Sequence, residues 1–168
     1  AIISNLPFVE YNKIAMDEQE FIAQVRQNVQ DNTGIEFTSG KTDLYNFIPF
    51  KLYELLDTNG KLGIVLSNSW LGTDIGRKFF DALQYYYDIK AVVASDDKRW
   101  FKNADVVGTL LIMQKKSISQ PDLRHKISFW LVKKDIHSIN DDEMEVLVNS
   151  IVLNEILEPE IATFKQYS

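Results

Sequence analysis

The run Lys61-Leu62-Gly63-Ile64-Val65-Leu66-Ser67 is apolar at nearly every position. A strand with one face in water alternates apolar and polar side chains, whereas a strand covered on both faces does not. The run therefore predicts a buried strand in a sheet that other elements cover on both faces. Asn59-Gly60, directly before it, is a turn signal that separates this strand from the preceding segment.

Patterns on both sides of this strand predict alternating helices and strands. Apolar residues at helical spacing predict helices at 17–31, 44–56, 73–86 and 141–153. Short apolar runs predict further strands at 1–4, 89–94, 106–114 and 127–132. We therefore expect an α/β fold around a mostly parallel sheet. No helix separates 89–94 from 106–114, which predicts an antiparallel pair and one reversed strand near an edge.

Three residues bear on where the first two helices begin. Asp17 and Asp43 are the expected N-caps, because a carboxylate can accept hydrogen bonds from the first free amides of a helix. Pro49 lies inside the second helical pattern, where it predicts either a kink or a later start.

Composition limits the possible functions. The chain has 168 residues, 45% of them hydrophobic, and a net charge of −6, which suits one domain with its own core. An acidic chain argues against a general nucleic-acid coat, although such a module can act on DNA that another module holds. Cysteine is absent and no carboxylate pair has a third ligand spaced to join it, so we expect no metal site. No apolar run has the length of a membrane span, and we expect a cytoplasmic protein.

Five segments carry a resemblance to a known enzyme family, and together their order and spacing are specific. They resemble the C-terminal half of the methyltransferase domain in γ-class adenine-N6 DNA methyltransferases, such as type IIG and related restriction-modification enzymes. The segments are Ile2-Ile3-Ser4-Asn5-Leu6-Pro7-Phe8, Ser39-Gly40-Lys41-Thr42-Asp43-Leu44-Tyr45, residues 55–71, Gly76-Arg77-Lys78-Phe79-Phe80 and residues 100–107.

The first segment implies the catalytic site. The exocyclic nitrogen of adenine is a poor nucleophile, because its lone pair is delocalised into the ring. The Asn5 side-chain oxygen and the Leu6 backbone carbonyl can accept from its two N–H groups and so turn the lone pair toward a methyl donor. Pro7 stiffens the turn, and Phe8 offers a flat face on which an extruded base can stack. Asn5, Leu6, Pro7 and Phe8 are thus the expected catalytic residues.

The resemblance implies further contacts. Phe101 would add a second aromatic side chain at the base, and Asn5, Asp43 and Tyr45 would approach the cofactor, S-adenosyl-L-methionine. The residues by themselves leave plainer alternatives open. Asn5 can be a turn residue that bonds its own backbone, Asp43 a helix cap, and Tyr45 and Phe8 core residues.

Two departures from the family pattern matter. Leu6 stands where the DNA enzymes usually have proline, while ribosomal RNA adenine dimethyltransferases have Asn-Leu-Pro-Tyr or Asn-Ile-Pro-Tyr at this point. The Gly-rich turn that binds S-adenosylmethionine is missing from the chain. We therefore expect a partial Rossmann-like class I methyltransferase fold, cut from a longer protein and inactive alone.

The expected partner is double-stranded DNA. We expect residues 1–116 to form the second half of the catalytic domain and residues 117–168 an extension that leads toward a target-recognition region. A half sheet exposes an edge and an apolar face, so self-association of the chain is also expected. An RNA adenine methyltransferase and a non-catalytic DNA-binding module remain the alternatives.

Overall fold

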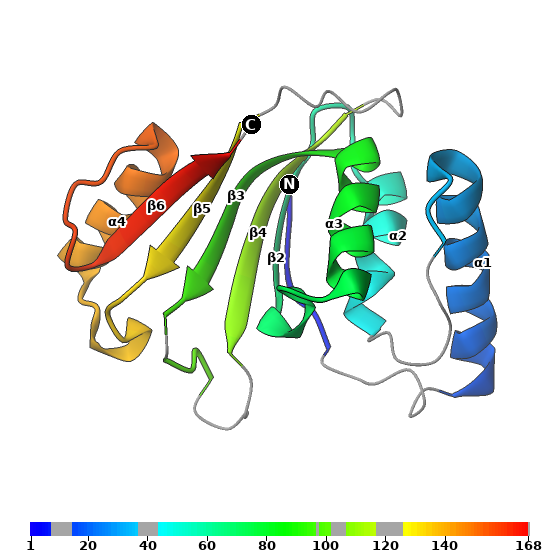
Figure 1. Ribbon diagram of the computed structural model, residues 1–168, viewed down its shortest axis with the longest axis horizontal. Coiled ribbons are helices and arrows are strands. Elements are labelled where there is room, and N and C mark those ends of the chain that lie inside the picture. Colours follow the sequence, from blue (N-terminus) through cyan, green and yellow to red (C-terminus); the bar gives the residue numbers. More distant parts are fainter. Residues whose placement is uncertain (8–14, 37–43, 97, 102–106, 117–125, 168) are drawn as a thin grey trace.

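The apolar run at 61–67 forms strand β2, in the interior of a six-stranded sheet with helices on both faces (Figure 1). The buried apolar side chains of β2, at Leu62, Ile64 and Leu66, all belong to the core on one face. The computed structural model describes residues 1–7, 15–36, 44–96, 98–101, 107–116 and 126–167. In these residues the strands are β1 (Ile2–Asn5), β2 (Lys61–Ser67), β3 (Tyr87–Ser95), β4 (Gly108–Lys115), β5 (Ile127–Val132) and β6 (Ala162–Tyr167). The helices are α1 (Met16–Thr33), α2 (Ile48–Leu55), α3 (Asp74–Tyr86) and α4 (Asp141–Leu153), with short 3₁₀ turns η2 (Leu44–Asn46), η3 (Asn68–Trp70) and η4 (Ile136–Ser138).

The sheet is mixed, with four strands in one direction and two reversed. Its order is β1-β2-β4-β3-β5-β6, with β1 and β2 parallel and β3 and β5 parallel. β4 is antiparallel to both β2 and β3, and β6 is antiparallel to β5. The antiparallel pair expected at 89–94 and 106–114 is confirmed. The reversed strand β4 lies between β2 and β3, however, and β6 adds a second reversed strand at the outer edge.

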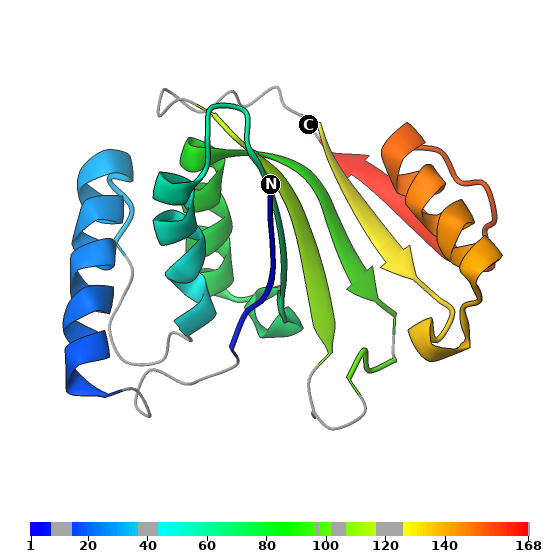
Figure 2. The same cartoon turned by 180° about the vertical axis from the view of Figure 1, so that it is seen from behind.

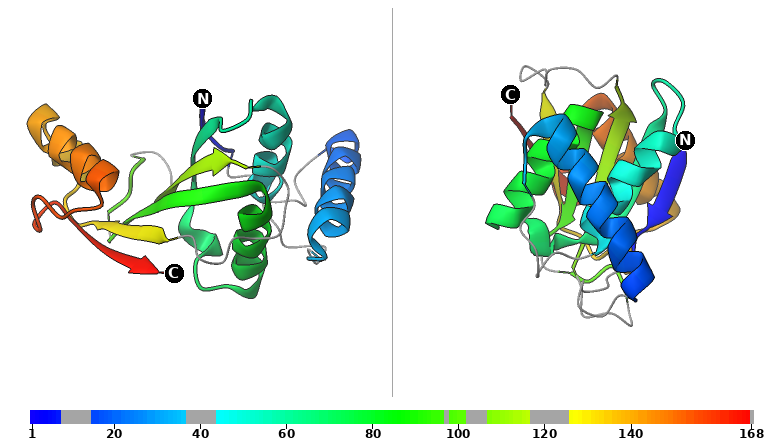
Figure 3. Two further views of the ribbon diagram at one scale, coloured as in Figure 1. Left: turned by 90° about the horizontal axis from the view of Figure 1, so that it is seen from above. Right: turned by 90° about the vertical axis from the view of Figure 1, so that its right-hand side faces the viewer.

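Two apolar cores lie on opposite faces of the sheet. α2 and α3 lie over the part of the sheet formed by β1, β2, β4 and β3, and α1 packs on their outer side; in the core between them, side chains such as Ile64, Leu66 and Leu111 are fully buried. α4 covers the other face, where Leu147 packs with Trp130 of β5. Figure 3 shows α1 as the outermost helix on its side. Strands β3 and β4 contribute to both cores, and this explains why their sequences do not alternate.

Tyrosine hydroxyls fasten the helix layer to the sheet. Tyr87 of β3 donates to the carbonyl of Pro49 at 2.7 Å, and Tyr53 of α2 donates to the carbonyl of Lys116, also at 2.7 Å. From the other direction, the ammonium of Lys115 donates to the carbonyls of Tyr53 and Leu56 at the end of α2. The two Lys115 bonds satisfy backbone carbonyls that the ending helix leaves without internal partners.

The helix starts differ in part from the sequence prediction. α1 begins at Met16 with Ala15 in the N-cap position, so the expected cap at Asp17 is wrong. The carboxylate of Glu18 accepts from the Ala15 amide at 3.3 Å instead. Pro49 lies in the first turn of α2, which confirms the later start, because a proline there loses no helical hydrogen bond. Asp43 lies outside the described residues.

The sequence analysis missed β6. Its residues, Ala-Thr-Phe-Lys-Gln-Tyr, are too polar and too few to stand out as a strand, and pairing with β5 supplies what the local pattern lacks. Strands β5 and β6 continue the same sheet beyond β3. A domain boundary near residue 117 therefore stays a prediction.

The joint between β2 and α3 is closely packed around Gly76. Thr73 caps α3: its hydroxyl accepts from the Gly76 amide at 3.0 Å and donates to the Trp70 carbonyl at 3.0 Å. A Cβ atom on Gly76 would stand 1.7 Å from the Trp70 carbonyl oxygen. No side chain fits at this position without moving the backbone of η3.

Gly76→Ala should therefore lower the free energy of unfolding by about 2–4 kcal/mol, because a methyl group must displace backbone. Gly63→Ala is the matched control, since a Cβ there would meet only Ile3 Cγ1, at 4.0 Å. Urea denaturation of both variants measures the difference. Equal midpoints for the two variants would contradict the packing described here.

Candidate active site

The parallel strands β1 and β2 end side by side at one edge of the sheet, the lower edge in Figure 1. Asn5, the last residue of β1, is in register with Val65, and the amide of Leu6 donates to the Val65 carbonyl at 3.0 Å. Figure 2 shows β1 at the margin of the sheet from behind. Open α/β sheets bind their ligands at the carboxyl ends of parallel strands, so Asn5 lies where a ligand site is expected.

Asn5, Leu6 and Pro7 differ in burial. The side chain of Leu6 is only 3% exposed and belongs to the core beneath the helix layer, whereas Asn5 and Pro7 are exposed. A buried leucine between two exposed residues anchors the strand exit at one point and leaves the Asn5 amide facing outward. Phe8 lies outside the described residues.

The turn that follows β2 is held by a set of short-range bonds. The hydroxyl of Ser67 accepts from the Ser69 amide at 3.1 Å, and the Leu71 amide donates to the Asn68 carbonyl at 2.9 Å. The Asn68 amide also donates to the carbonyl of Val107, just before β4, at 2.8 Å. Hydrogen bonds therefore hold the turn internally and also join it to the residue just before β4.

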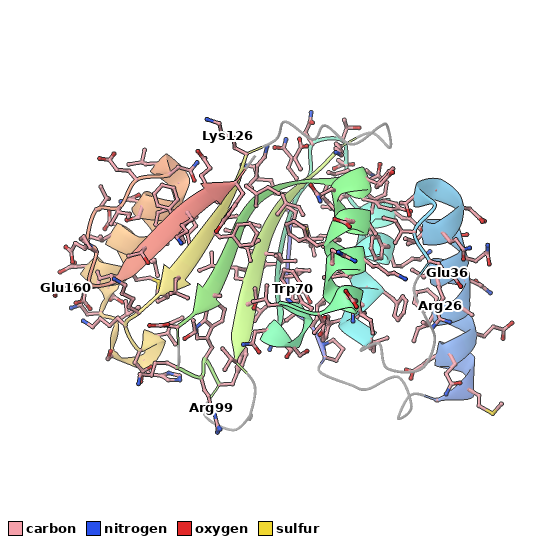
Figure 4. The ribbon with its side chains drawn as sticks, viewed as in Figure 1. Arg26, Glu36, Trp70, Arg99, Lys126 and Glu160 are labelled. Atoms are coloured by element: carbon pink, nitrogen blue, oxygen red, sulfur yellow. The ribbon has the colours of Figure 1, made fainter. Side chains whose placement is uncertain are left out.

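Aromatic residues form the wall between this turn and α3. Trp70 is 6% exposed; its ring stacks on Phe80 with centroids 5.9 Å apart and meets Phe79 edge-on, also at 5.9 Å. Figure 4 shows Trp70 between the sheet and α3. A hollow of about 380 Å³ opens next to it, lined by Leu71, Thr73 and Arg77 among others.

Tyr45 reaches the same turn from η2. It is 2% exposed, and its hydroxyl and the Ser69 hydroxyl lie 2.8 Å apart in a hydrogen bond. Ser69 itself is exposed. The sequence analysis named Tyr45 as a cofactor contact but did not predict its bond to Ser69, because no short-range pattern joins residues 24 positions apart.

Phe101 lies beyond the end of β3 at the same edge, half-buried. Its neighbour Trp100 packs on Gly108 at the start of β4, where a Cβ would stand 2.5 Å from the indole ring. Figure 4 shows Arg99 projecting beyond this edge. The edge thus brings together Asn5, Leu6 and Pro7, the η3 turn and the loop that carries Phe101. Asp43 cannot be placed.

Two glycines at this edge, Gly76 and Gly108, are closely packed. The Trp70 backbone occupies the space next to Gly76, and the Trp100 ring occupies the space next to Gly108. Neither glycine therefore leaves room for a ligand. In the part of the chain that the structure describes, no group of three or more His, Cys, Asp or Glu side chains could hold a metal ion. Nor is any helix there long and apolar enough to cross a membrane.

Other hollows lie away from Asn5. One of about 610 Å³ lies toward the opposite ends of the strands, beside α4, and is lined by Lys61, Lys90 and Lys126. It shares no residue with the Asn5 edge. This hollow is therefore separate from the strand ends at which Asn5 lies.

Comparison with solved structures gives the class to which this fold belongs. The type IIG restriction endonuclease BpuSI superposes with a TM-score of 0.65 at 8% identity, covering 99% of this chain and 19% of that one. The methyltransferase subunit of a type I restriction-modification system from Streptococcus thermophilus gives 0.64 at 16% identity, covering 96% and 33%. The type ISP enzyme LlaBIII bound to DNA gives 0.58 at 13% identity, covering 99% and 12%. The chain thus has the fold of a Rossmann-like, S-adenosylmethionine-dependent methyltransferase.

Within that class the family is shown by sequence. The chain belongs to the Eco57I restriction-modification methylase family, whose model matches residues 1–101. No curated protein sequence matches it. The chain spans a third or less of the solved chains named above.

The Leu6 amide gives a direct test of the strand exit. Leu6→Pro removes the bond to the Val65 carbonyl as well as the buried side chain, whereas Leu6→Ala removes only the side chain. The proline variant should therefore be less stable than the alanine variant by about 1 kcal/mol, the typical net worth of one hydrogen bond. Urea denaturation midpoints measure the gap, and equal stabilities would show that this bond does not hold the exit.

Proposed function

We propose that this chain presents adenine for N6 methylation in double-stranded DNA, as part of a restriction-modification protein. The observation that carries the proposal is the exit of β1. Asn5 is exposed at the carboxyl end of a parallel strand, followed by Leu6, anchored by its backbone and side chain, and by Pro7. Membership in a restriction-modification methylase family supports the same function.

The chemistry follows from two hydrogen-bond acceptors at a fixed spacing. The Asn5 side-chain oxygen and the Leu6 carbonyl would each accept from one N–H of the adenine amino group, and so hold the nitrogen lone pair toward the methyl group. A preorganised pair of acceptors stabilises the charge that develops on this nitrogen during attack. S-adenosylmethionine supplies the methyl group when bound. Its main pocket would come from residues outside this chain.

Aromatic side chains would hold the extruded base. A base turned out of the duplex loses its stacking partners, and a flat side chain replaces part of that energy. Phe8 is the proposed stacking face and Phe101 the second aromatic side chain, from the loop beyond β3. Asn5 and Asp43 remain proposed cofactor contacts; for Tyr45 we assign the proposed contact to the ring, and its hydroxyl bonds Ser69.

Several consequences rest on this proposal. Residues 117–168 would lead toward a target-recognition region, and the isolated chain would not methylate DNA. Self-association of the isolated chain would follow from the edge strand β1 and from Ile3, which is 88% exposed beside it.

The test uses the complete gene product. Asn5→Ala should lower the rate constant for methyl transfer from labelled S-adenosylmethionine to duplex DNA by about 100-fold or more, the usual loss when one preorganised polar contact is removed. Asn28→Ala, the same change at an exposed position on α1, is the control and should keep the wild-type rate.

Each other outcome points to a different function. Transfer to RNA but not to DNA would support an RNA adenine methyltransferase, to which Leu6 is also suited. DNA binding without transfer to either nucleic acid would indicate a non-catalytic module. Full activity in the Asn5→Ala variant would contradict the role of Asn5.

A further inference from the structure

Two turns from different connections of the chain meet at the candidate site. η2 lies between α1 and α2, and η3 lies between β2 and α3. The hydrogen bond between the Tyr45 and Ser69 hydroxyls, 2.8 Å long, joins these two turns. It joins residues 24 positions apart, so it fixes tertiary geometry and not local chain shape.

The two partners of this bond are in different environments. Tyr45 is 2% exposed and belongs to the same core cluster as Leu6 and Trp70. Ser69 is exposed, at the rim of the edge where β1 and β2 end. A rigid, buried ring thus holds a surface turn by one polar contact at its tip.

This arrangement matters because the η3 turn borders the strand exit. β1 and β2 are neighbours, and the Leu6 amide bonds Val65, two residues before β2 ends. The turn that begins at Ser67 therefore continues directly beside the backbone whose Leu6 carbonyl we assign to the adenine amino group. A shift of the η3 turn would change the space in which the base must lie.

We propose that Tyr45 is a positioning residue: through Ser69 it fixes the η3 turn beside Asn5 and Leu6. The role rests on the proposed function, since positioning has meaning only if a base is held at Asn5. A misplacement of about 1 Å around a reacting group can cost a large factor in rate, even when binding is nearly unchanged.

The expected energetic signature separates positioning from general stability. In Tyr45→Phe the ring stays in the core, and the hydroxyl of exposed Ser69 can bond water instead, so the melting temperature should hardly move. Tyr87→Phe is the matched control. It removes the hydroxyl that donates to the Pro49 carbonyl at 2.7 Å, and this carbonyl is buried and left without that partner.

The Tyr87 hydroxyl is a permanent donor, because burial, together with Tyr53 and Tyr86 nearby, raises its pKa far above the usual value. Tyr87→Phe should therefore lower the melting temperature by several degrees, about 4 °C, and leave the transfer rate unchanged. Tyr45→Phe is thus expected to slow methyl transfer with little change in stability, and Tyr87→Phe to lower stability with no change in the transfer rate.

The experiment has two readouts on the complete gene product. Hydrogen exchange followed by mass spectrometry reports on the amides of the η3 turn, whatever the protein does. Single-turnover methyl transfer and the affinities for DNA and cofactor report on function. The variants are Tyr45→Phe, Ser69→Ala, the double variant, Ser69→Thr, which keeps the hydroxyl, and Tyr87→Phe.

We expect Tyr45→Phe and Ser69→Ala each to speed exchange in residues 67–71 and to slow single-turnover transfer about 10-fold, with affinities within about 2-fold of wild type. The double variant should be no slower than either single variant, because both remove one bond. Ser69→Thr should keep most of the wild-type rate, and Tyr87→Phe should change neither readout.

Unchanged exchange in residues 67–71 would overturn the inference, as would faster exchange with an unchanged transfer rate. A wild-type protein that transfers no methyl group would overturn the proposed function, and the positioning role with it. In that case faster exchange in Tyr45→Phe would still show that the Tyr45–Ser69 hydrogen bond holds the η3 turn. A failure of the proposed function and a failure of the hydrogen bond therefore give different results.

Discussion

The parallel pairing of β1 with β2 is the constraint on which the rest of the structure depends. Four residues of β1 are in register with β2, and the Leu6 amide extends the ladder by one more bond to Val65. This pairing places an exposed Asn5 beside the turn that leaves β2. Were β1 shifted by one residue, Leu6 would leave the core and Asn5 would enter it, because successive side chains point to opposite faces of a sheet.

The same pairing connects fold to chemistry. The base-presenting site proposed above needs two acceptors at a fixed spacing and walls that do not move, and both would come from strand ends that the core holds. Leu6, the residue after Asn5, has its side chain buried in the core. Trp70, Thr73 and Gly76 fix the joint between β2 and α3. The Tyr45–Ser69 bond then ties that joint to the η2 turn, which precedes α2.

Much of this could be predicted from the sequence, and the gaps have physical causes. The apolar run at 61–67 and the helices at 73–86 and 141–153 carry their signals locally, and each element formed where expected. β6 depends on pairing with β5, a partner distant in the chain. The start of α1 depends on backbone geometry that residue type does not show. The Tyr45–Ser69 bond was beyond sequence reasoning for the same reason, while the role of Asn5 was suggested only by the resemblance to a family.

The most direct measurement of the central claim is the identity of the methylated base. DNA from cells that express the complete gene product, wild-type or Asn5→Ala, is digested to nucleosides and analysed by mass spectrometry. The site described here predicts N6-methyladenine with the wild-type protein and its loss with the variant. Methylated cytosine in place of methylated adenine, or N6-methyladenine that persists in the Asn5→Ala cells, would contradict the account.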